Sequence, residues 1–306
     1  MDKTLPARTE LHAIPTLTLT DQQFLVGDSG GVPTTITGML SLAQGATPQP
    51  AVVLMHGSGG IGPGVALWVR QLNAMGVAAF VLDGFTGRGL VSVSTDQARL
   101  GRLAFVLDIY RALALLARHP AIDPARIVVM GFSRGGQGAV YAGMTRFRAM
   151  WNADGPRPAA TIALYPDCGT RYIDDTDLLP TSLRIFHGVP DDFNPIAPVR
   201  AHVARLREAG HDVALTEYAD AHHGFDNPLG SATLIAGAQS VRDCRIEERA
   251  PGLLVNAATG LPFTYADACV ATSAHVGGHA VAGAEVRRDV AGFLNGLFTP
   301  TMGTPS

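Results

Sequence analysis

The feature that most constrains the fold of this chain is the run Gly131-Phe132-Ser133-Arg134-Gly135-Gly136. It follows the apolar segment 126–131 and precedes a run of small residues. In the pattern G-x-S-x-G, the two glycines allow a sharp turn from a strand into a helix, and this turn exposes the serine hydroxyl. The pattern therefore predicts a buried strand, a strained turn at Ser133, and a helix whose N-terminus favours developing negative charge.

Other apolar runs repeat the same strand pattern along the chain. They are rich in β-branched residues, and most lack polar alternation, as expected for strands buried on both faces. Helical patterns separate them, and the clearest, at 96–119, ends at His119-Pro120. This alternation predicts an α/β fold with a mostly parallel central sheet and helices on both faces. The predicted strands are 51–56, 77–82, 126–131, 159–165, 183–188 and 212–218.

The two ends of the chain differ from its centre. Segments near 15–20, 23–27 and 34–42 alternate better and are interpreted as antiparallel edge strands. Residues 226–280 are rich in Gly, Ala and Pro with weak periodicity, and a final helix is expected at roughly 281–298. We therefore predict a single α/β domain over 1–306, with an irregular, cysteine-containing insertion at about 226–280 before the last helix.

A serine hydroxyl needs a base, and the base needs an orienting carboxylate. After a G-x-S-x-G turn the expected chain order is Ser, then Asp or Glu, then His, each following a later strand. The first partner site is the doublet Asp191-Asp192, and the second is the doublet His222-His223. Position alone leaves each partner ambiguous by one residue.

An oxyanion formed at Ser133 needs two hydrogen-bond donors. The backbone amide of Arg134 is one expected donor, because it immediately follows the nucleophile. The second is expected in the loop after the first central strand, His56-Gly57-Ser58-Gly59-Gly60. We favour the amide of Ser58, with Gly59 next, and expect His56 to brace this loop.

Two other motifs suggest different chemistry. The loop 57–62 also fits G-x-G-x-x-G, and Asp83 closes the next strand, so a dinucleotide-binding oxidoreductase is a second hypothesis. It leaves the ordered Ser, Asp and His sites unexplained. His275 and His279 are four residues apart, but two glycines between them argue against a helix, and a companion Glu is absent from the motif. We therefore predict neither a bound cofactor nor a metal.

Composition removes several function classes. The formal charge of 23 − 26 = −3 gives no basic face for nucleic acid. Lys3 is the only lysine, which excludes P-loop, protein kinase, pyridoxal and Ser–Lys chemistry. The sequence contains no uninterrupted apolar stretch of 18 residues, so no membrane span is expected. Oligomeric state cannot be predicted from these features.

The three cysteines allow one disulfide. We predict a bridge between Cys244 and Cys269, which lie in the weakly periodic segment, and an unpaired Cys168. The other hypothesis is three reduced thiols in a cytoplasmic enzyme. The first 20 residues do not form a signal peptide, although a trimmed leader would leave the same start. With the bridge, we expect a periplasmic or secreted protein.

The motifs MHGSGG, LDGFTGRG, HPAIDPARIVVMGFSRGG, HGVPDDFNP and AHHGF resemble the dienelactone hydrolase family of α/β-hydrolases, from about Val52 to Phe225. The resemblance implies Asp191 as the acid, three residues after Gly188, and His223 as the base. The founding enzyme of the family has a cysteine nucleophile where this chain has Ser133. Its substrate-binding arginines have no counterpart here, and Arg88 is either a residue of the site or an ion-paired structural residue.

The combined prediction is a cofactor-free serine hydrolase acting on small to medium acyl esters or lactones through an acyl-enzyme. The expected catalytic residues are Ser133, Asp191 and His223, with Arg134 and Ser58 in the oxyanion hole. The expected partner is a small-molecule ester. Acyl transfer on the same triad and a non-catalytic binding module are the alternatives.

Overall fold

The computed structural model describes residues 2–298, and its centre is one eight-stranded sheet. The strands are β1 (Arg8–Thr18), β2 (Val32–Leu42), β3 (Gln49–Met55), β4 (Ala78–Asp83), β5 (Ile122–Phe132), β6 (Ala160–Leu164), β8 (Ser182–Gly188) and β9 (Val213–Tyr218). Their order is β1-β2-β4-β3-β5-β6-β8-β9. The β1–β2 and β2–β4 pairs are antiparallel, and the other pairs are parallel. The predicted α/β class is confirmed.

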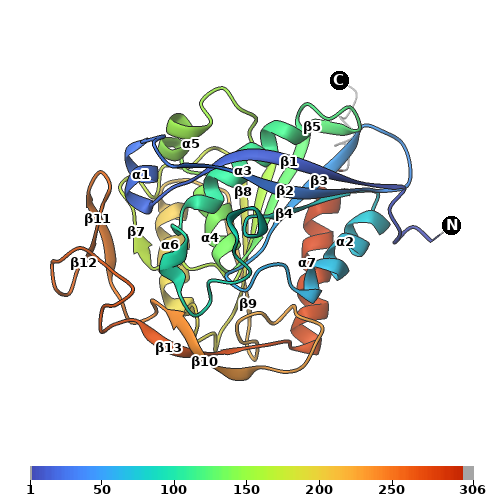
Figure 1. Cartoon of the computed structure of the whole chain (residues 1–306). Helices are drawn as coiled ribbons and strands as arrows, with labels where there is room; N and C mark the ends of the chain where they lie inside the picture. The colour runs from blue at the N-terminus through green and yellow to red at the C-terminus, as the bar shows by residue number, and fades with distance from the viewer. Residues whose placement is uncertain (1, 299–306) are drawn as a thin grey trace.

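Helices cover both faces of this sheet because alternate strand residues point to opposite sides. On β3, Val52 and Leu54 belong to one buried cluster with Trp68, whereas Val53 and Met55 belong to another with Phe105. Helices α2 (Pro63–Ala74) and α7 (Ala280–Phe298) cover the first face and lie side by side in Figure 1. The second cluster includes residues from α1 (Asp21–Val26), α3 (Ala104–Leu116), α4 (Arg134–Tyr141), α5 (Thr145–Trp151) and α6 (Ile196–Glu208).

The parallel strands bring their carboxyl ends to one edge of the sheet. Met55 pairs with Gly131, Phe132 with Leu164, and Gly188 with Tyr218. The loops that follow β3, β5, β8 and β9 therefore start close together, and they contain all the residues predicted for the site.

The segment 23–27, predicted as a strand, is instead part of helix α1. Thr20 accepts a hydrogen bond from the Gln23 amide at 3.1 Å, and the Gln23 side chain accepts one from the Thr20 amide at 3.0 Å. This capping box starts a helix, and Gly27 ends it with a left-handed φ of 73°. The prediction was wrong because local capping outweighed the apolar alternation.

The helix predicted at 96–119 is shorter, since regular α-helix begins only at Ala104. Residues Gln97–Arg99 form a single 3-10 turn instead. The guanidinium of Arg134 donates to the carbonyls of Gln97 and Leu100, at 3.0 and 2.9 Å. These carbonyls would otherwise accept hydrogen bonds in the first turns of a longer helix, so a tertiary contact delays the start of the helix.

The segment 226–280 is more regular than predicted. It contains β10 (Thr233–Ser240), β11 (Ile246–Ala250), β12 (Leu253–Asn256) and β13 (Ala271–Val276). Strands β10 and β13 pair with each other, and β11 joins β12 to the two-residue strand β7 (Thr170–Arg171). The strands are short and their pairing contains register shifts, so the sequence shows little periodicity. We call residues 226–279 the extension, and it lies along the lower left of Figure 1.

A disulfide between Cys244 and Cys269 crosslinks the extension, as predicted, and Cys168 is buried and free. The bridge closes a loop with a sequence separation of 25 residues. The chain-entropy model assigns such a loop about 3–4 kcal/mol of stabilisation.

Replacing both bridged cysteines by serine is expected to lower the free energy of unfolding by about 3–4 kcal/mol, because the unfolded chain gains the entropy that the bridge removes. Chemical denaturation measures this change. Peptide mapping without reductant, on protein purified under oxidising conditions, should find Cys168 as the one alkylatable thiol. Three alkylated thiols would contradict the bridge.

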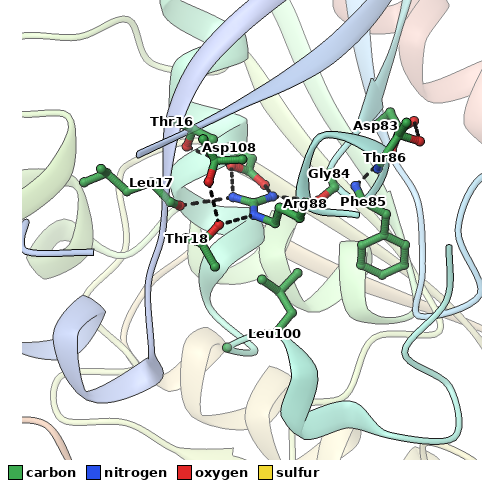
Figure 2. A network of polar contacts seen from close by, with 12 residues as sticks. Thr16, Leu17, Thr18, Asp83, Gly84, Phe85, Thr86, Arg88, Leu100 and Asp108 are labelled. Carbon is green, nitrogen blue, oxygen red and sulfur yellow. Dashed lines mark hydrogen bonds and ion pairs between the residues drawn. The ribbon is translucent and has the colours of Figure 1, made fainter. Parts of the chain in front are cut away.

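Arg88 is a structural residue and does not belong to the site. Its guanidinium forms two hydrogen bonds with the carboxylate of Asp108, at 2.7 and 2.9 Å, and both side chains are buried. Thr18 and the carbonyls of Leu17 and Gly84 accept its remaining hydrogen bonds (Figure 2). The pair therefore joins β1 and α3 to the loop after β4.

Replacing Arg88 by methionine is expected to lower the free energy of unfolding by about 3–5 kcal/mol, because the Asp108 carboxylate stays buried without its counter-charge. The double variant Arg88→Met/Asp108→Leu should recover part of this loss, since no unpaired charge remains. Urea denaturation of both variants measures the difference. Equal losses in the two variants would show that packing, and not the unpaired charge, sets the cost.

Within residues 2–298, the helices are all too short or too polar to cross a membrane.

Candidate active site

Ser133 occupies a strained turn between β5 and α4. Its backbone has φ 54° and ψ −116°, a conformation that residues other than glycine rarely adopt. The turn is tight because a Cβ at Gly131 would lie 2.0 Å from the Gly135 carbonyl, and one at Gly135 would lie 2.2 Å from the Met55 carbonyl. These two glycines of the motif are therefore required by close backbone contacts.

The structure brings Ser133, His223 and Asp191 into one hydrogen-bonded chain. The Ser133 Oγ lies 2.8 Å from His223 Nε2, and His223 Nδ1 lies 2.8 Å from Asp191 Oδ2. An ionised carboxylate only accepts hydrogen bonds, so His223 donates from Nδ1 and accepts the serine hydroxyl at Nε2. All three side chains are buried at the carboxyl edge of the sheet. The arrangement can remove a proton from Ser133.

The loop after β8 fixes the carboxylate of Asp191. Its Oδ1 accepts hydrogen bonds from the amides of Phe193 and Asn194, both at 2.9 Å. Its Oδ2 is thereby directed at His223. The neighbouring Asp192 turns away from Ser133 and accepts hydrogen bonds from the amide and the ring of His275. Asp191 and His223 therefore belong to the hydrogen-bonded chain that reaches Ser133. The other member of each doublet, Asp192 or His222, does not.

The loop after β3 lies directly against Ser133. A Cβ at Gly57 would lie 3.1 Å from the Cβ of Ser133. The Gly57 carbonyl accepts hydrogen bonds from His56 Nδ1, at 2.8 Å, and from the Gly60 amide. Because a trans peptide points its N–H opposite to its carbonyl, these bonds fix the direction of the Ser58 amide. Ser58 lines the pocket together with Ser133.

His56 braces this loop and does not act as a second base. Its Nε2 accepts a hydrogen bond from the Gly84 amide at 3.1 Å, so the ring proton is on Nδ1. Burial lowers the pKa of His56, which keeps the ring neutral.

Gln97, which the sequence patterns did not single out, connects the two sides of the expected oxyanion hole. Its side-chain oxygen accepts hydrogen bonds from Ser58 Oγ at 3.0 Å and from the Arg134 guanidinium at 2.9 Å. The backbone amide of Gln97 donates to the side-chain oxygen of Gln239 in the extension. The local signal at Gln97 is only a polar residue in an apparently helical segment, so sequence alone could not identify this role.

Aromatic rings hold the imidazole of His223. Phe193 stacks on it with ring centroids 4.6 Å apart and an interplanar angle of 19°, and Tyr165 packs edge-on at 4.7 Å. The Tyr165 hydroxyl donates to Asp226 at 2.6 Å, and the Trp68 indole donates to the same carboxylate at 2.7 Å. Burial raises the pKa of Asp226. Tyr165 ends the predicted strand 159–165, and Phe193 lies in the loop after the predicted strand 183–188. This position at the carboxyl ends of the strands is the one signal that could have found them.

A pocket of about 260 Å³ opens at Ser133 and His223. Its lining is mostly apolar and includes Val65 of α2 and Phe132 of β5. The extension supplies one wall through Ile235, Ala238 and Val276. The backbone also connects the extension to His223, because the Gly277 amide donates to the His223 carbonyl at 2.9 Å. The extension thus shapes the site.

The residues of the competing motifs have other partners. Asp83 accepts hydrogen bonds from the backbone amides of Phe85 and Thr86, so its carboxylate is already hydrogen-bonded within its own turn. His279 immediately precedes helix α7, and its Nδ1 accepts a hydrogen bond from the Ala282 amide at 3.2 Å. His275 lies in β13 and its ring binds Asp192. The two histidines of this motif therefore serve different neighbours.

Comparison with known proteins identifies one family. Residues 36–251 match the model of the dienelactone hydrolase family. A search of curated proteins found no match.

Solved structures share the fold at low sequence identity. A putative dienelactone hydrolase from Klebsiella pneumoniae is 18% identical, with a TM-score of 0.52, over 71% of this chain and 89% of that one. A dienelactone hydrolase-like promiscuous phosphotriesterase from metagenomic libraries is 17% identical, with a TM-score of 0.61, over 95% and 99%. A butyrate-bound esterase from Thermogutta terrifontis is 19% identical, with a TM-score of 0.51, over 64% and 82%.

Proposed function

The chain belongs to the dienelactone hydrolase family and is a carboxylic ester hydrolase, and we propose that Ser133, His223 and Asp191 perform its reaction. The observation that supports this assignment is the continuous hydrogen-bonded chain from Ser133 Oγ through the ring of His223 to Asp191. The strained turn at Ser133 adds to it, because backbone strain of this kind gathers at active sites.

In the proposed reaction, Ser133 Oγ attacks the acyl carbonyl while His223 Nε2 takes its proton. Asp191 stabilises the imidazolium that forms and keeps its Nδ1–H directed inward. His223 then returns the proton to the leaving alcohol, and an acyl-enzyme remains on Ser133. A water molecule repeats the sequence, with His223 again as the base, and releases the acid.

We assign the oxyanion hole to the backbone amides of Arg134 and Ser58. The Arg134 amide lies at the N-terminus of α4, where the helix dipole favours negative charge. The hydrogen bonds to Gly57 and Gln97 hold the opposing loop in place before substrate arrives. Such preorganised donors typically contribute about 10²–10³-fold to kcat each.

The pocket favours acyl groups of small to medium length. Its volume of about 260 Å³ and mainly apolar lining suit a short alkyl chain, and charged groups would lose hydration there. The esterase solved with butyrate bound shares this fold, which agrees with that preference.

Replacing Ile235 by tryptophan tests the acyl preference. Ile235 lines the pocket from β10, whereas its neighbour Leu234 is exposed and does not line it, so Leu234→Trp is the matched control. With p-nitrophenyl esters from acetate to decanoate, Ile235→Trp should lower kcat/KM for the long esters by about tenfold relative to acetate. Leu234→Trp should leave that ratio unchanged. Equal profiles in both variants would place the acyl chain elsewhere.

Hydrolysis is favoured over acyl transfer by a second, polar pocket that also touches Ser133. It measures about 40 Å³ and is lined by Gln137, Asp167 and Asn194 among others. Such a polar site has room for a water molecule. Product analysis in the presence of an added alcohol separates the two reactions, because acyl transfer would give the new ester and hydrolysis the free acid.

A further inference from the structure

Asp192 and His222, the two doublet residues outside the catalytic hydrogen-bonded chain, lie near a third side chain, His275. Asp192 follows the catalytic acid, His222 precedes the catalytic base, and His275 extends from β13 in the extension. One ligand atom from each lies within 4.8 Å of the other two. We propose that these three side chains bind one divalent transition-metal ion, for which Zn²⁺ is the best match.

The donor set supports this proposal. Two imidazole nitrogens and one carboxylate oxygen form a common Zn²⁺ site, with bonds of about 2.0–2.2 Å and a fourth position left for water. Tetrahedral ligands at that distance lie about 3.3–3.6 Å apart. The ligand atoms of His275 and Asp192, 2.9 Å apart, therefore need to separate slightly, and all three ligand atoms already lie within 4.8 Å of one another. His275 is 43% exposed and Asp192 38% exposed, so an ion can reach the cluster from solvent.

His222 supplies the second, independent observation. Its Nδ1 is buried and has no hydrogen-bond partner among the described residues. A buried polar nitrogen without a partner is unfavourable, so a ligand that used it would remove that cost. The ring of His222 lies 5.3 Å from the ring of His275, between centroids. The unpartnered nitrogen therefore belongs to a side chain that already packs on the other imidazole.

The hydrogen bonds already present orient the remaining two ligands. His275 Nδ1 donates to Asp192 Oδ2 at 2.9 Å, and the His275 amide donates to Asp192 Oδ1 at 2.8 Å. On binding, the ion takes the place of the Nδ1 proton of His275, which is released to solvent, while the amide still holds Oδ1. Metal ligands are commonly oriented by second hydrogen bonds of this kind.

One positive charge lies close to the cluster. The Arg242 Nη1 is 3.9 Å from Asp192 Oδ2. The same nitrogen donates to the carbonyls of Asp192 and Ser273, at 2.6 and 2.7 Å, and Arg242 Nε faces Asp243 at 3.6 Å. These partners hold the guanidinium in place, so Asp192 Oδ2 can turn to the ion without leaving Arg242 unpaired.

The ion would connect two loops of the site to strand β13. Asp192 and His222 are adjacent in sequence to Asp191 and His223, and His275 is adjacent to Val276, which lines the pocket. The metal would therefore fasten the extension to the loops that position the acid and the base. This role goes beyond the proposed hydrolysis, which needs only the serine, histidine and aspartate.

Titration of chelator-treated full-length protein with Zn²⁺ alone tests the proposal. Isothermal titration calorimetry should show one ion per chain, and His275→Ala should raise the Kd by at least about tenfold. Zn²⁺ should also raise the Tm of the wild type but not of that variant, because an ion that binds only the folded chain stabilises it. The Tm without metal shows that each variant is folded.

The matched control is His12→Ala, since Glu10, His12 and His119 form the other histidine-containing cluster among residues 2–298 that could hold an ion. This variant should bind Zn²⁺ like the wild type. Loss of binding in His12→Ala with retention in His275→Ala would overturn the proposal, as would absence of binding to the wild type at millimolar Zn²⁺. Because these readouts do not measure turnover, their failure leaves the hydrolase assignment intact.

Discussion

Replacing Ser133 by alanine is expected to reduce kcat for p-nitrophenyl esters by at least about a thousandfold. The acyl-enzyme cannot form without the Oγ, and removal of a nucleophile of this type normally has an effect of that size. The fold should persist, because the strained turn is held by the glycine contacts and by the hydrogen bond from the Ser133 amide to the Leu164 carbonyl. Initial rates at saturating ester measure the loss.

The matched control is Ser29→Ala. Ser29 is an exposed serine in the loop between α1 and β2. Its removal should leave kcat unchanged and confirm that the assay reports on Ser133. Undiminished ester turnover in Ser133→Ala would refute the nucleophile assignment.

The two doublets should respond oppositely to substitution. Asp191→Asn and His223→Ala should each reduce kcat by about a thousandfold or more, because they break the chain that activates Ser133. Asp192→Asn and His222→Ala should each cost less than about tenfold in metal-free buffer, because neither side chain is hydrogen-bonded to that chain. Steady-state kinetics on all four variants gives the comparison.

The reverse pattern, with larger losses at Asp192 and His222, would contradict the assignment of the acid and the base. Asp192→Asn is the closest control available for Asp191→Asn, since the two residues share one loop and the substitution is identical.

The strand–helix alternation and the turn at Ser133 were sufficient to predict the central sheet. Buried parallel strands such as β3 and β6 are apolar except for Gln49 and Thr161, and this pattern is set by the fold itself. The same regularity predicts that the residues after β5, β8 and β9 converge. Which member of each doublet faces Ser133 was not predictable from position, because it depends on loop hydrogen bonds such as those from Phe193 and Asn194 to Asp191.

The remaining differences arise from contacts between distant residues. The capping box at Thr20 is a local signal, but the late start of helix α3 depends on Arg134, which is more than 30 residues away. Likewise, the strands of the extension form through pairing between β10 and β13, and their own sequence shows little periodicity. The roles of Gln97 and of the Asp192–His275 contact have the same origin.

The most direct test of the central claim is to label the native enzyme with a fluorophosphonate probe and to map the modified peptide by mass spectrometry. The account predicts one probe per chain, attached to Ser133, and labelling slower by at least about a hundredfold in His223→Ala, which lacks the base. A probe attached to another serine of the pocket, such as Ser58 or Ser94, or a native enzyme that remains unlabelled, would contradict it.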